Sequence, residues 1–190
     1  MSATTAAELI RLVCERGGRI AVAESLTGGR LSDAIVSVPG ASAAFSGAIV
    51  AYDTALKQRL LGVDGELLQR RGPVDPEVAK QMASGVRRAC AVPDDGAGVE
   101  AGDSHVAPAT LGIATTGVAG PDPDPQTGQG AGTVWVGVSL ADSAVATGER
   151  AWAVRLPVVQ GSREQVRAMS VEHAVRLGIA ALRGDFAELE

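Results

Sequence analysis

The sequence predicts an α/β protein in which a single three-layer α/β/α domain, residues 1–190, is built on a mixed sheet with a late β-hairpin. In the first half of the chain, short runs of small and β-branched residues alternate with amphipathic helical patterns, as in parallel βαβ units. Two further strand patterns, over residues 133–140 and 149–156, are separated by a short polar segment, which predicts an antiparallel hairpin. A length of 190 residues with 46% hydrophobic content suits one domain with a sizeable core.

The first half of the chain carries most of the predicted helices. The expected elements are a helix over residues 4–16, a strand over 20–23, a helix from 31, a strand over 45–52, a helix after 53, a short helix over 63–71 and a helix over 75–91. Gly17-Gly18 ends the first helix, Asp53 can cap the helix that follows it, and Asp75-Pro76 is a strong start for the last. Periodicity predicts these inward-facing side chains: Leu9, Ile10, Val13 and Cys14 in the first helix, Leu56, Leu60 and Leu61 after residue 53, and Val78, Met82 and Val86 in the last.

The second half of the chain is expected to complete the sheet. Residues 93–109 are acidic, rich in glycine and proline and without periodicity, which predicts an exposed loop. A strand over 110–116 and a second loop over 121–131 lead into the predicted hairpin. A final helix over 161–182 is expected to place one set of side chains on a single face: Val166, Met169, His173 and Leu177.

Composition limits the classes of function that the chain can serve. A net charge of −5 argues against a nucleic-acid surface, which needs clustered basic residues. No apolar run is long enough to span a bilayer, and the N-terminus lacks the features of a secretory signal. Cys14 and Cys90 suggest neither a disulfide framework nor a zinc site, and both are expected to be buried in helices. We therefore expect a cytoplasmic protein without a nucleic-acid or membrane partner.

Residues 19–30, R-I-A-V-A-E-S-L-T-G-G-R, form a strand-to-helix corner around which the chain is organised. Ser25 follows the strand, Thr27 is a candidate helix N-cap, and Gly28-Gly29 allows a tight turn. A hydroxyl at such a corner lies near unpaired backbone N–H groups and the positive end of a helix, which can hold an anion or an oxyanion. A turn with capping residues and no chemistry explains the same stretch equally well.

Ser25, Tyr52 and Lys57 come from adjacent connections and carry chemically useful side chains. If the strands before them are neighbours, the three side chains converge at the carboxyl edge of the sheet. A serine needs a base to become a nucleophile, and a lysine can be that base when burial keeps its amine neutral. A tyrosine hydroxyl between them can relay a proton or orient the amine.

A lysine at position 57 stands out because the chain has 17 basic residues and only Lys57 and Lys80 are lysines. Arginine cannot replace lysine as a base, since it stays protonated. The alternative interpretation is an exposed i, i+4 ion pair between Asp53 and Lys57, worth a few tenths of a kcal/mol. For Tyr52 the alternative is a strand-end aromatic residue with its hydroxyl in water.

Other motifs give weaker indications. There is no G-x-S-x-G elbow, and His105 and His173 without an H-E-x-x-H motif predict no metal site. The segment T-T-G-V-A-G-P at 115–121 follows a strand, and its hydroxyl and N–H groups can cradle a phosphate or a ribose, although an ordinary turn has the same composition. Arg163, at the start of the last helix, can pair with a phosphate or be simply exposed.

Several segments in one order resemble the CinA C-terminal-like family of nicotinamide-nucleotide amidases. They are A-E-S-L-T-G-G at 23–29, V-P-G-A-S-A-A-F-S-G-A-I-V-A-Y at 38–52, G-P-V-D-P-E-V-A at 72–79, T-G-V-A-G-P at 116–121 and G-T-V-W-V-G-V at 132–138. The resemblance covers nearly the whole chain and implies a compact α/β/α domain. It also implies hydrolysis of the carboxamide of nicotinamide mononucleotide to nicotinic acid mononucleotide and ammonia, with no cofactor and no metal.

The resemblance assigns roles to individual residues. It implies that Ser25 is the nucleophile, that Lys57 is its base and that Tyr52 lies beside them. The implied substrate-binding residues are Thr27, Gly28, Gly29, Thr116, Gly117, Gly120, Pro121 and Arg163, the last as a phosphate partner. The expected partner is therefore a small-molecule nucleotide, and the apolar late strands are also compatible with a homo-oligomer.

Two positions depart from the family's pattern. Leu26 replaces the usual cysteine, and the Y-S-N-x-x-K segment becomes Tyr52-Asp53-Thr54-Ala55-Leu56-Lys57, so that a carboxylate follows the tyrosine. A carboxylate at 53 favours a protonated Lys57, which works against its role as a base. The loop over 93–109 is also longer than usual. Two other hypotheses therefore stay open: a nucleotide-binding or regulatory module without catalysis, and a structural oligomerisation domain with an empty pocket.

Overall fold

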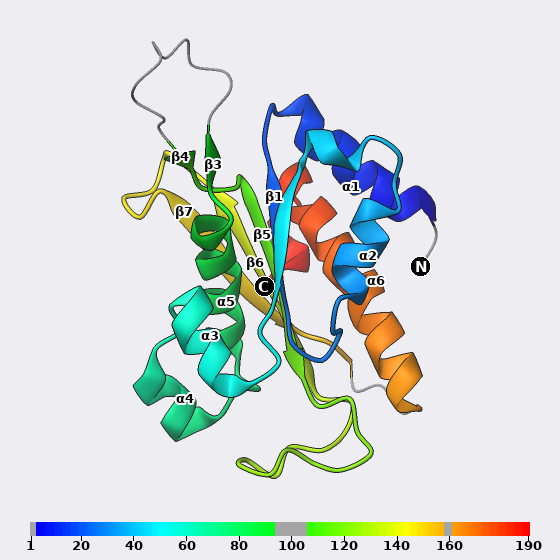
Figure 1. Ribbon diagram of the computed structural model, residues 1–190, viewed down its shortest axis with the longest axis vertical. Coiled ribbons are helices and arrows are strands. Elements are labelled where there is room, and N and C mark those ends of the chain that lie inside the picture. The colour runs from blue at the N-terminus through cyan, green and yellow to red at the C-terminus, as the bar shows by residue number, and fades with distance from the viewer. Residues whose placement is uncertain (1–2, 94–105, 158–160) are drawn as a thin grey trace.

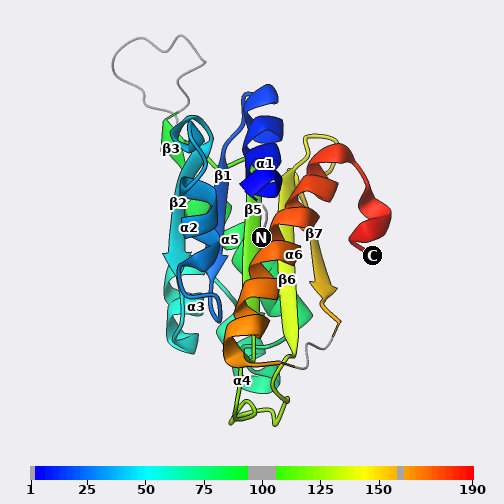
Figure 2. The same cartoon turned by 90° about the vertical axis from the view of Figure 1, so that its right-hand side faces the viewer.

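A computed structural model describes residues 3–93, 106–157 and 161–190, and it contains a mixed five-stranded sheet between two layers of helices (Figures 1 and 2). The strands of this sheet are β1 (Ile20–Glu24), β2 (Phe45–Val50), β5 (Leu111–Gly117), β6 (Val134–Ala141) and β7 (Glu149–Arg155). The helices are α1 (Ala3–Glu15), α2 (Arg30–Val36), α3 (Thr54–Leu61), α4 (Gly65–Arg71), α5 (Pro76–Ala89) and α6 (Arg163–Arg183). Helices α1, α2 and α6 cover one face, and α3, α4 and α5 lie on the other. The predicted α/β fold is confirmed.

The strand order of the sheet is β2-β1-β5-β6-β7. β1 runs parallel to both of its neighbours, whereas β5, β6 and β7 are successively antiparallel, with β6 and β7 forming the predicted hairpin. Because β1, β2 and β5 are parallel, their carboxyl ends meet at one edge of the sheet. The register at that edge pairs Glu24 with Val50 on one side and with Thr115 on the other.

Two apolar cores hold the layers together, one on each face of the sheet. β1 is fully buried and contributes to both, because alternate residues of a strand point to opposite faces. Ile20 and Val22 pack in the core that includes α1, α2 and α6. Ala21 and Ala23 pack in the core that includes α5. The side chains of β1 are thus smaller on the face that α5 covers.

Helix α5 lies so close to the sheet that glycine is required beneath it. A Cβ atom at Gly112 would lie 2.1 Å from the backbone oxygen of Ala83, and one at Gly137 would lie 2.0 Å from that of Ala79. Both distances are far below van der Waals contact, so the helix backbone rests almost directly on β5 and β6. The face of α5 predicted to be inward is confirmed, since Val78, Met82 and Val86 are fully buried.

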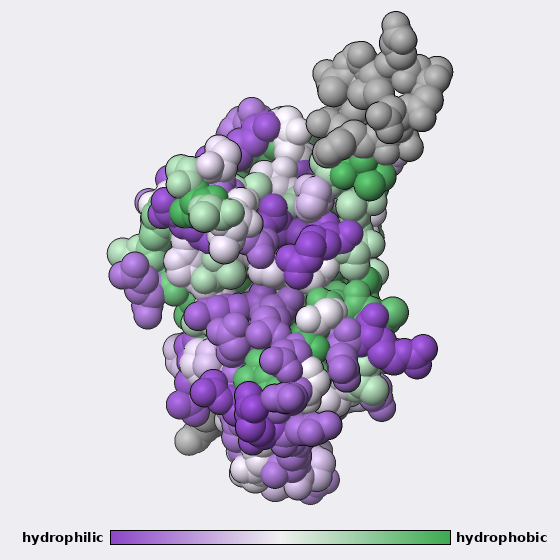
Figure 3. Space-filling view, turned by 90° about the vertical axis from the view of Figure 1, so that its left-hand side faces the viewer, coloured by the Kyte–Doolittle hydropathy of each residue, from purple (hydrophilic) through white to green (hydrophobic). Residues whose placement is uncertain are grey.

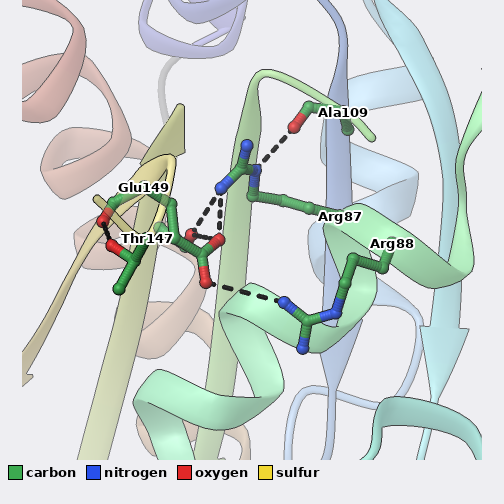
Figure 4. A network of polar contacts seen from close by, with 6 residues as sticks. Arg87, Arg88, Ala109, Thr147 and Glu149 are labelled. Carbon is green, nitrogen blue, oxygen red and sulfur yellow. Dashed lines mark hydrogen bonds and ion pairs between the residues drawn. The ribbon is translucent and has the colours of Figure 1, made fainter. Parts of the chain in front are cut away.

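A polar network ties the end of α5 to the β6–β7 hairpin (Figure 4). Arg87 is 5% exposed; its Nε donates to the backbone oxygen of Ala109 at 2.6 Å and its Nη1 to Ser139 Oγ at 3.1 Å. Nη1 also forms an ion pair with the Glu149 carboxylate. The exposed Arg88 forms a second ion pair with this carboxylate, with Nη1 3.5 Å from Oε1. Burial lowers the pKa of Arg87, and the Glu149 carboxylate opposes that shift. The buried guanidinium is thus kept charged by partners from three strands or loops.

The predicted face of the helix after residue 53 is confirmed for Leu61, which is buried, and for Leu56, which packs against the core on the α5 side, but it is wrong for Leu60, which is 48% exposed. Lys57 is 1% exposed and lies on the buried side of α3 together with Leu61. A lysine in place of an apolar residue on the inner face is unusual, because burying an ammonium group is costly unless it is hydrogen-bonded.

Two other helix faces also differ from prediction. In α6, Met169 is 36% exposed and Ser170 is buried instead, because the Ser170 hydroxyl donates to the backbone oxygen of Val166 at 2.7 Å and so needs no water. In α1, Leu12 joins the core and Cys14 is exposed. Cys90 is half-buried, and both cysteines are free thiols.

The predicted acidic loop over 93–109 lies largely outside the described residues. Its two ends pair as short antiparallel strands, β3 (Val92–Pro93) and β4 (Val106–Ala107).

Figure 3 shows that the outer surface on the α3–α5 side is mostly hydrophilic, as expected for helices that bury only one face. Among the described residues, no helix is both long and apolar enough to span a bilayer.

Replacing Gly137 by alanine is expected to destabilise the fold by on the order of 3 kcal/mol, because the new methyl group must displace the backbone of α5. Gly130 is the matched control, since nothing lies within 4 Å of a Cβ built there and its φ is not positive. Chemical unfolding of the two variants measures the difference. Equal stability of Gly137→Ala and Gly130→Ala would contradict the close approach of α5.

Candidate active site

Ser25 and Lys57 meet at the carboxyl edge of the parallel strands. Ser25 directly follows β1, and Lys57 lies one turn into α3, the helix that follows β2. Lys57 Nζ donates to Ser25 Oγ at 3.1 Å and to the backbone oxygen of Ala51 at 2.8 Å. A longer contact of 3.5 Å reaches the backbone oxygen of Tyr52. The amine therefore touches the serine hydroxyl directly.

The environment of Lys57 favours the neutral amine. Desolvation by burial lowers its pKa from 10.5 to about 8, and the Asp53 carboxylate opposes this by raising it. The alternative of an exposed Asp53–Lys57 ion pair is wrong for this structure, because Lys57 is buried and no ion pair joins the two among the described residues. Asp53 instead caps α3, as predicted, and accepts from the backbone N–H of Ala55 at 2.8 Å.

Glu24 organises the corner that carries Ser25. Its carboxylate is fully buried and accepts from the backbone N–H groups of Gly29, Leu31 and Ser32 at 2.8–3.0 Å. The Ser32 hydroxyl donates to it as well, at 2.8 Å. A carboxylate at the start of a helix satisfies unpaired N–H groups and is favoured by the helix dipole. The sequence carries a signal for this role, an acidic residue a few positions before a helix start, although the pattern predicts Thr27 as the cap.

The prediction that Thr27 caps α2 is wrong. The N-cap position of α2 is Gly29, which has a φ of +96°, and no side-chain hydrogen bond from this position caps the helix. Thr27 is fully buried, and its hydroxyl shares a hydrogen bond of 2.8 Å with the hydroxyl of Thr115. From α6, Arg167 donates to the backbone oxygens of Leu26 and Thr27 at 2.9 and 2.8 Å. The turn after Ser25 is thus held by a residue that nothing local in the sequence could reveal.

A cavity of about 540 Å³ opens above Ser25 and Lys57. Its walls are the β2–α3 connection and the loop after β5, and Arg163 closes one side. Of the predicted substrate-binding residues, Thr116, Gly117, Gly120 and Arg163 line it. Thr27, Gly28, Gly29 and Pro121 are not among the lining residues. Thr116 has its hydroxyl committed to the backbone oxygen of Pro73 at 2.6 Å.

Tyr52 lies at the cavity but not between Ser25 and Lys57. Its side chain is 58% exposed, and its hydroxyl accepts from Arg163 Nη2 at 2.9 Å. Among the described residues no hydrogen bond joins this hydroxyl to Ser25 or Lys57. The structure therefore places the tyrosine beside the pair with its hydroxyl directed to an arginine.

The described part of the chain contains no cluster of three or more His, Cys, Asp or Glu side chains suited to a metal ion. His105 lies outside the described residues. His173, on α6, is half-buried, and its ring nitrogen contacts the backbone oxygen of Met169 at 3.0 Å. Ser25 and Lys57 give the site a nucleophile with an adjacent base.

A sequence profile of the CinA C-terminal domain matches residues 2–94 and 98–182. The chain belongs to the CinA C-terminal domain family. A CinA-like protein of Frankia casuarinae is 39% identical over 176 residues, which are 93% of this chain and 34% of the relative. A putative competence-damage inducible protein of Limosilactobacillus reuteri is 36% identical over 174 residues, 92% of this chain and 36% of the relative. The chain spans about a third of the length of these CinA relatives.

Solved structures of CinA proteins share the fold. Competence damage-inducible protein A (ComA) from Klebsiella pneumoniae is 27% identical, with a TM-score of 0.77 over 95% of this chain and 96% of that one. The CinA superfamily protein from Enterobacter cloacae is 24% identical, with a TM-score of 0.78 over 95% and 91% of the two chains. Neither name states a reaction.

The burial of Lys57 predicts a specific dependence of stability on pH. Its pKa is about 8 in the folded protein and about 10.5 when unfolded, so between these values the unfolded chain binds the additional proton. The destabilisation is fully present below pH 8 and is relieved as the pH rises to about 10.5, by roughly 3 kcal/mol. Urea unfolding of the wild type and of Lys57→Met across this range measures the difference between their free energies of unfolding. A difference that does not change with pH would contradict the lowered pKa.

Proposed function

We propose that this chain hydrolyses the carboxamide of nicotinamide mononucleotide to nicotinic acid mononucleotide and ammonia, with Ser25 as nucleophile and Lys57 as base. The observation that carries the proposal is the contact of 3.1 Å between Ser25 Oγ and a buried amine whose pKa is lowered to about 8. A serine acts as a nucleophile only when a neighbouring base takes its proton. Membership in the CinA family, with the motif order given above, makes a nicotinamide nucleotide the expected substrate.

The reaction proceeds in two steps. Neutral Lys57 takes the proton of Ser25 Oγ as this oxygen attacks the carboxamide carbon, and the same proton then passes to the leaving nitrogen, which departs as ammonia. Lys57 next takes a proton from water, whose oxygen attacks the ester formed on Ser25. When the tetrahedral intermediate collapses, Lys57 returns the proton to Oγ and the acid is released.

The turn after Ser25 offers donors for the oxyanion. In the described part of the chain, no hydrogen bond engages the backbone N–H of Leu26 or of Thr27. The Leu26 carbonyl, in the same peptide group as the Thr27 N–H, accepts from Arg167, and the Ser25 carbonyl, in the same peptide group as the Leu26 N–H, accepts from the N–H of Gly28 at 3.2 Å. The orientation of both peptide groups is therefore set before substrate binds. Preorganised N–H donors of this kind stabilise the charge that develops on the carbonyl oxygen in acyl transfer.

The cavity suits the proposed substrate in size and charge. Its volume of about 540 Å³ falls in the range of roughly 300–1,000 Å³ usual for small-molecule sites. Arg163 supplies a cation for the phosphate, and Asp53 and Asp122, which also line the cavity, supply negative charge for the cationic pyridinium ring. The two charges of the nucleotide therefore have complementary groups in the same cavity.

A nucleotide-binding module without turnover is the second candidate, and Asp53 is the observation that favours it. Its carboxylate raises the pKa of Lys57 and so reduces the fraction of neutral base. Calorimetry with nicotinamide mononucleotide, run beside an ammonia assay, separates the two functions, because a module binds the nucleotide and releases no ammonia.

Ammonia release from nicotinamide mononucleotide is expected from the wild type and is expected to fall by at least about a thousandfold in Ser25→Ala and in Lys57→Ala, since each change removes half of the nucleophile–base pair. Lys80→Ala is the matched control, because Lys80 is the chain's other lysine and lies on the surface in an ion pair with Glu77. Undiminished release by Ser25→Ala would refute the proposed nucleophile.

The variant Asp53→Asn is expected to shift the pH dependence of the reaction. Asparagine caps a helix as well as aspartate does, so α3 is retained while the charge that raises the pKa of Lys57 is lost. The acidic limb of kcat/KM, near pH 8 in the wild type, should move to lower pH, and activity below that pH should rise. An unchanged limb would show that the group titrating there is not Lys57.

A further inference from the structure

Arg163 connects two walls of the cavity through its guanidinium group. From the first position of α6, Nη1 donates to the backbone oxygen of Gly120 at 2.8 Å and Nη2 donates to Tyr52 Oη at 2.9 Å. Gly120 belongs to the loop after β5, and Tyr52 follows β2. The arginine therefore lies where two chain segments from different strands approach each other at the cavity.

The charge of Arg163 has no counterion among the described residues. Both of its hydrogen-bond partners are neutral oxygens, and no carboxylate of the described residues forms an ion pair with it. The neighbouring Glu164 is paired with Arg30, and the carboxylate of Asp124 accepts from the N–H and the hydroxyl of Thr127. A guanidinium has five N–H groups, of which two are used here, so three remain for an anionic ligand.

We propose that Tyr52 is a positioning residue: its hydroxyl, together with the Gly120 carbonyl, holds in place Arg163, the phosphate partner that the family resemblance implies. The pair thereby selects phosphorylated over unphosphorylated nicotinamide ribosides. This inference rests on the proposed function for its substrate. It assigns Tyr52 to substrate binding and removes it from the proton transfer between Ser25 and Lys57.

The geometry separates the tyrosine from that proton transfer. Lys57 Nζ reaches Ser25 Oγ directly, so no group is needed to bridge them. The backbone oxygen of Tyr52 faces Lys57 at 3.5 Å, whereas its hydroxyl lies against Arg163. A fixed guanidinium binds an oxyanion with less loss of side-chain entropy than a mobile one, and this is what a neutral positioning partner supplies.

The test compares nicotinamide mononucleotide with nicotinamide riboside, which lacks the phosphate, in wild type, Tyr52→Phe, Arg163→Gln and the double variant. For the mononucleotide, Tyr52→Phe should raise KM about tenfold and Arg163→Gln about a hundredfold, with kcat changed less than about twofold. For the riboside, KM and kcat should not change. The KM of the double variant for the mononucleotide should equal that of Arg163→Gln alone, because Tyr52 acts only through Arg163.

Arg59→Gln is the control for loss of a positive charge, because Arg59 is exposed on α3 and is not among the residues that line the cavity. Because the side chain of Tyr52 is exposed, the melting temperature of Tyr52→Phe should equal that of the wild type. A large loss of kcat on both substrates with KM unchanged would overturn the proposal and return Tyr52 to the proton path.

Dissociation constants measured by calorimetry in the Ser25→Ala background separate this inference from the proposed function. Tighter binding of the mononucleotide than of the riboside, lost in Arg163→Gln and weakened in Tyr52→Phe, supports the inference even if the wild type releases no ammonia. An affinity for the mononucleotide that neither substitution changes would overturn it, whatever the catalytic activity.

Discussion

The candidate active site depends on the burial of one amine against one hydroxyl. Lys57 occupies a position on α3 where an apolar side chain is expected, and the cost of removing its ammonium group from water is what brings its pKa to about 8. The two best hydrogen bonds of Nζ, to Ser25 Oγ and to the backbone oxygen of Ala51, are both compatible with a neutral or a charged amine. The protein thus retains a destabilising residue, as functional sites often do, and the rest of the fold has to stabilise it.

Three features of the fold provide that support. Parallel pairing of β1 with β2 and β5 brings the ends of these strands to one edge, so that Ser25 and α3 start beside each other. Glu24 and Arg167 fix the corner after Ser25 from opposite sides, one through N–H groups and the other through carbonyl oxygens. The close approach of α5 to β5 and β6, over Gly112 and Gly137, fixes the layer against which α3 packs.

Much of this arrangement could be predicted from the sequence because it is encoded locally. Strand and helix periods, the Asp53 and Asp75 caps and the late hairpin gave the layers and their order. Buried polar groups could not be predicted in the same way, because their partners come from distant segments. Arg167 is 141 residues from Leu26, and Arg163 is 111 from Tyr52. The predicted helix faces were wrong at some positions for a different reason. Ser170 and Lys57 turn inward because hydrogen bonds satisfy them, and hydrophobic spacing does not reveal such bonds.

The lowered pKa of Lys57 can be measured on the amine itself. The chain has two lysines, so a protein labelled with ¹³C at lysine Cε gives two signals, and Lys80→Arg identifies which belongs to Lys57. NMR titration of the Lys57 signal should give a pKa of about 8. If this signal titrates near the ordinary lysine value of about 10.4, the amine is not desolvated in solution, and the proposed base does not exist.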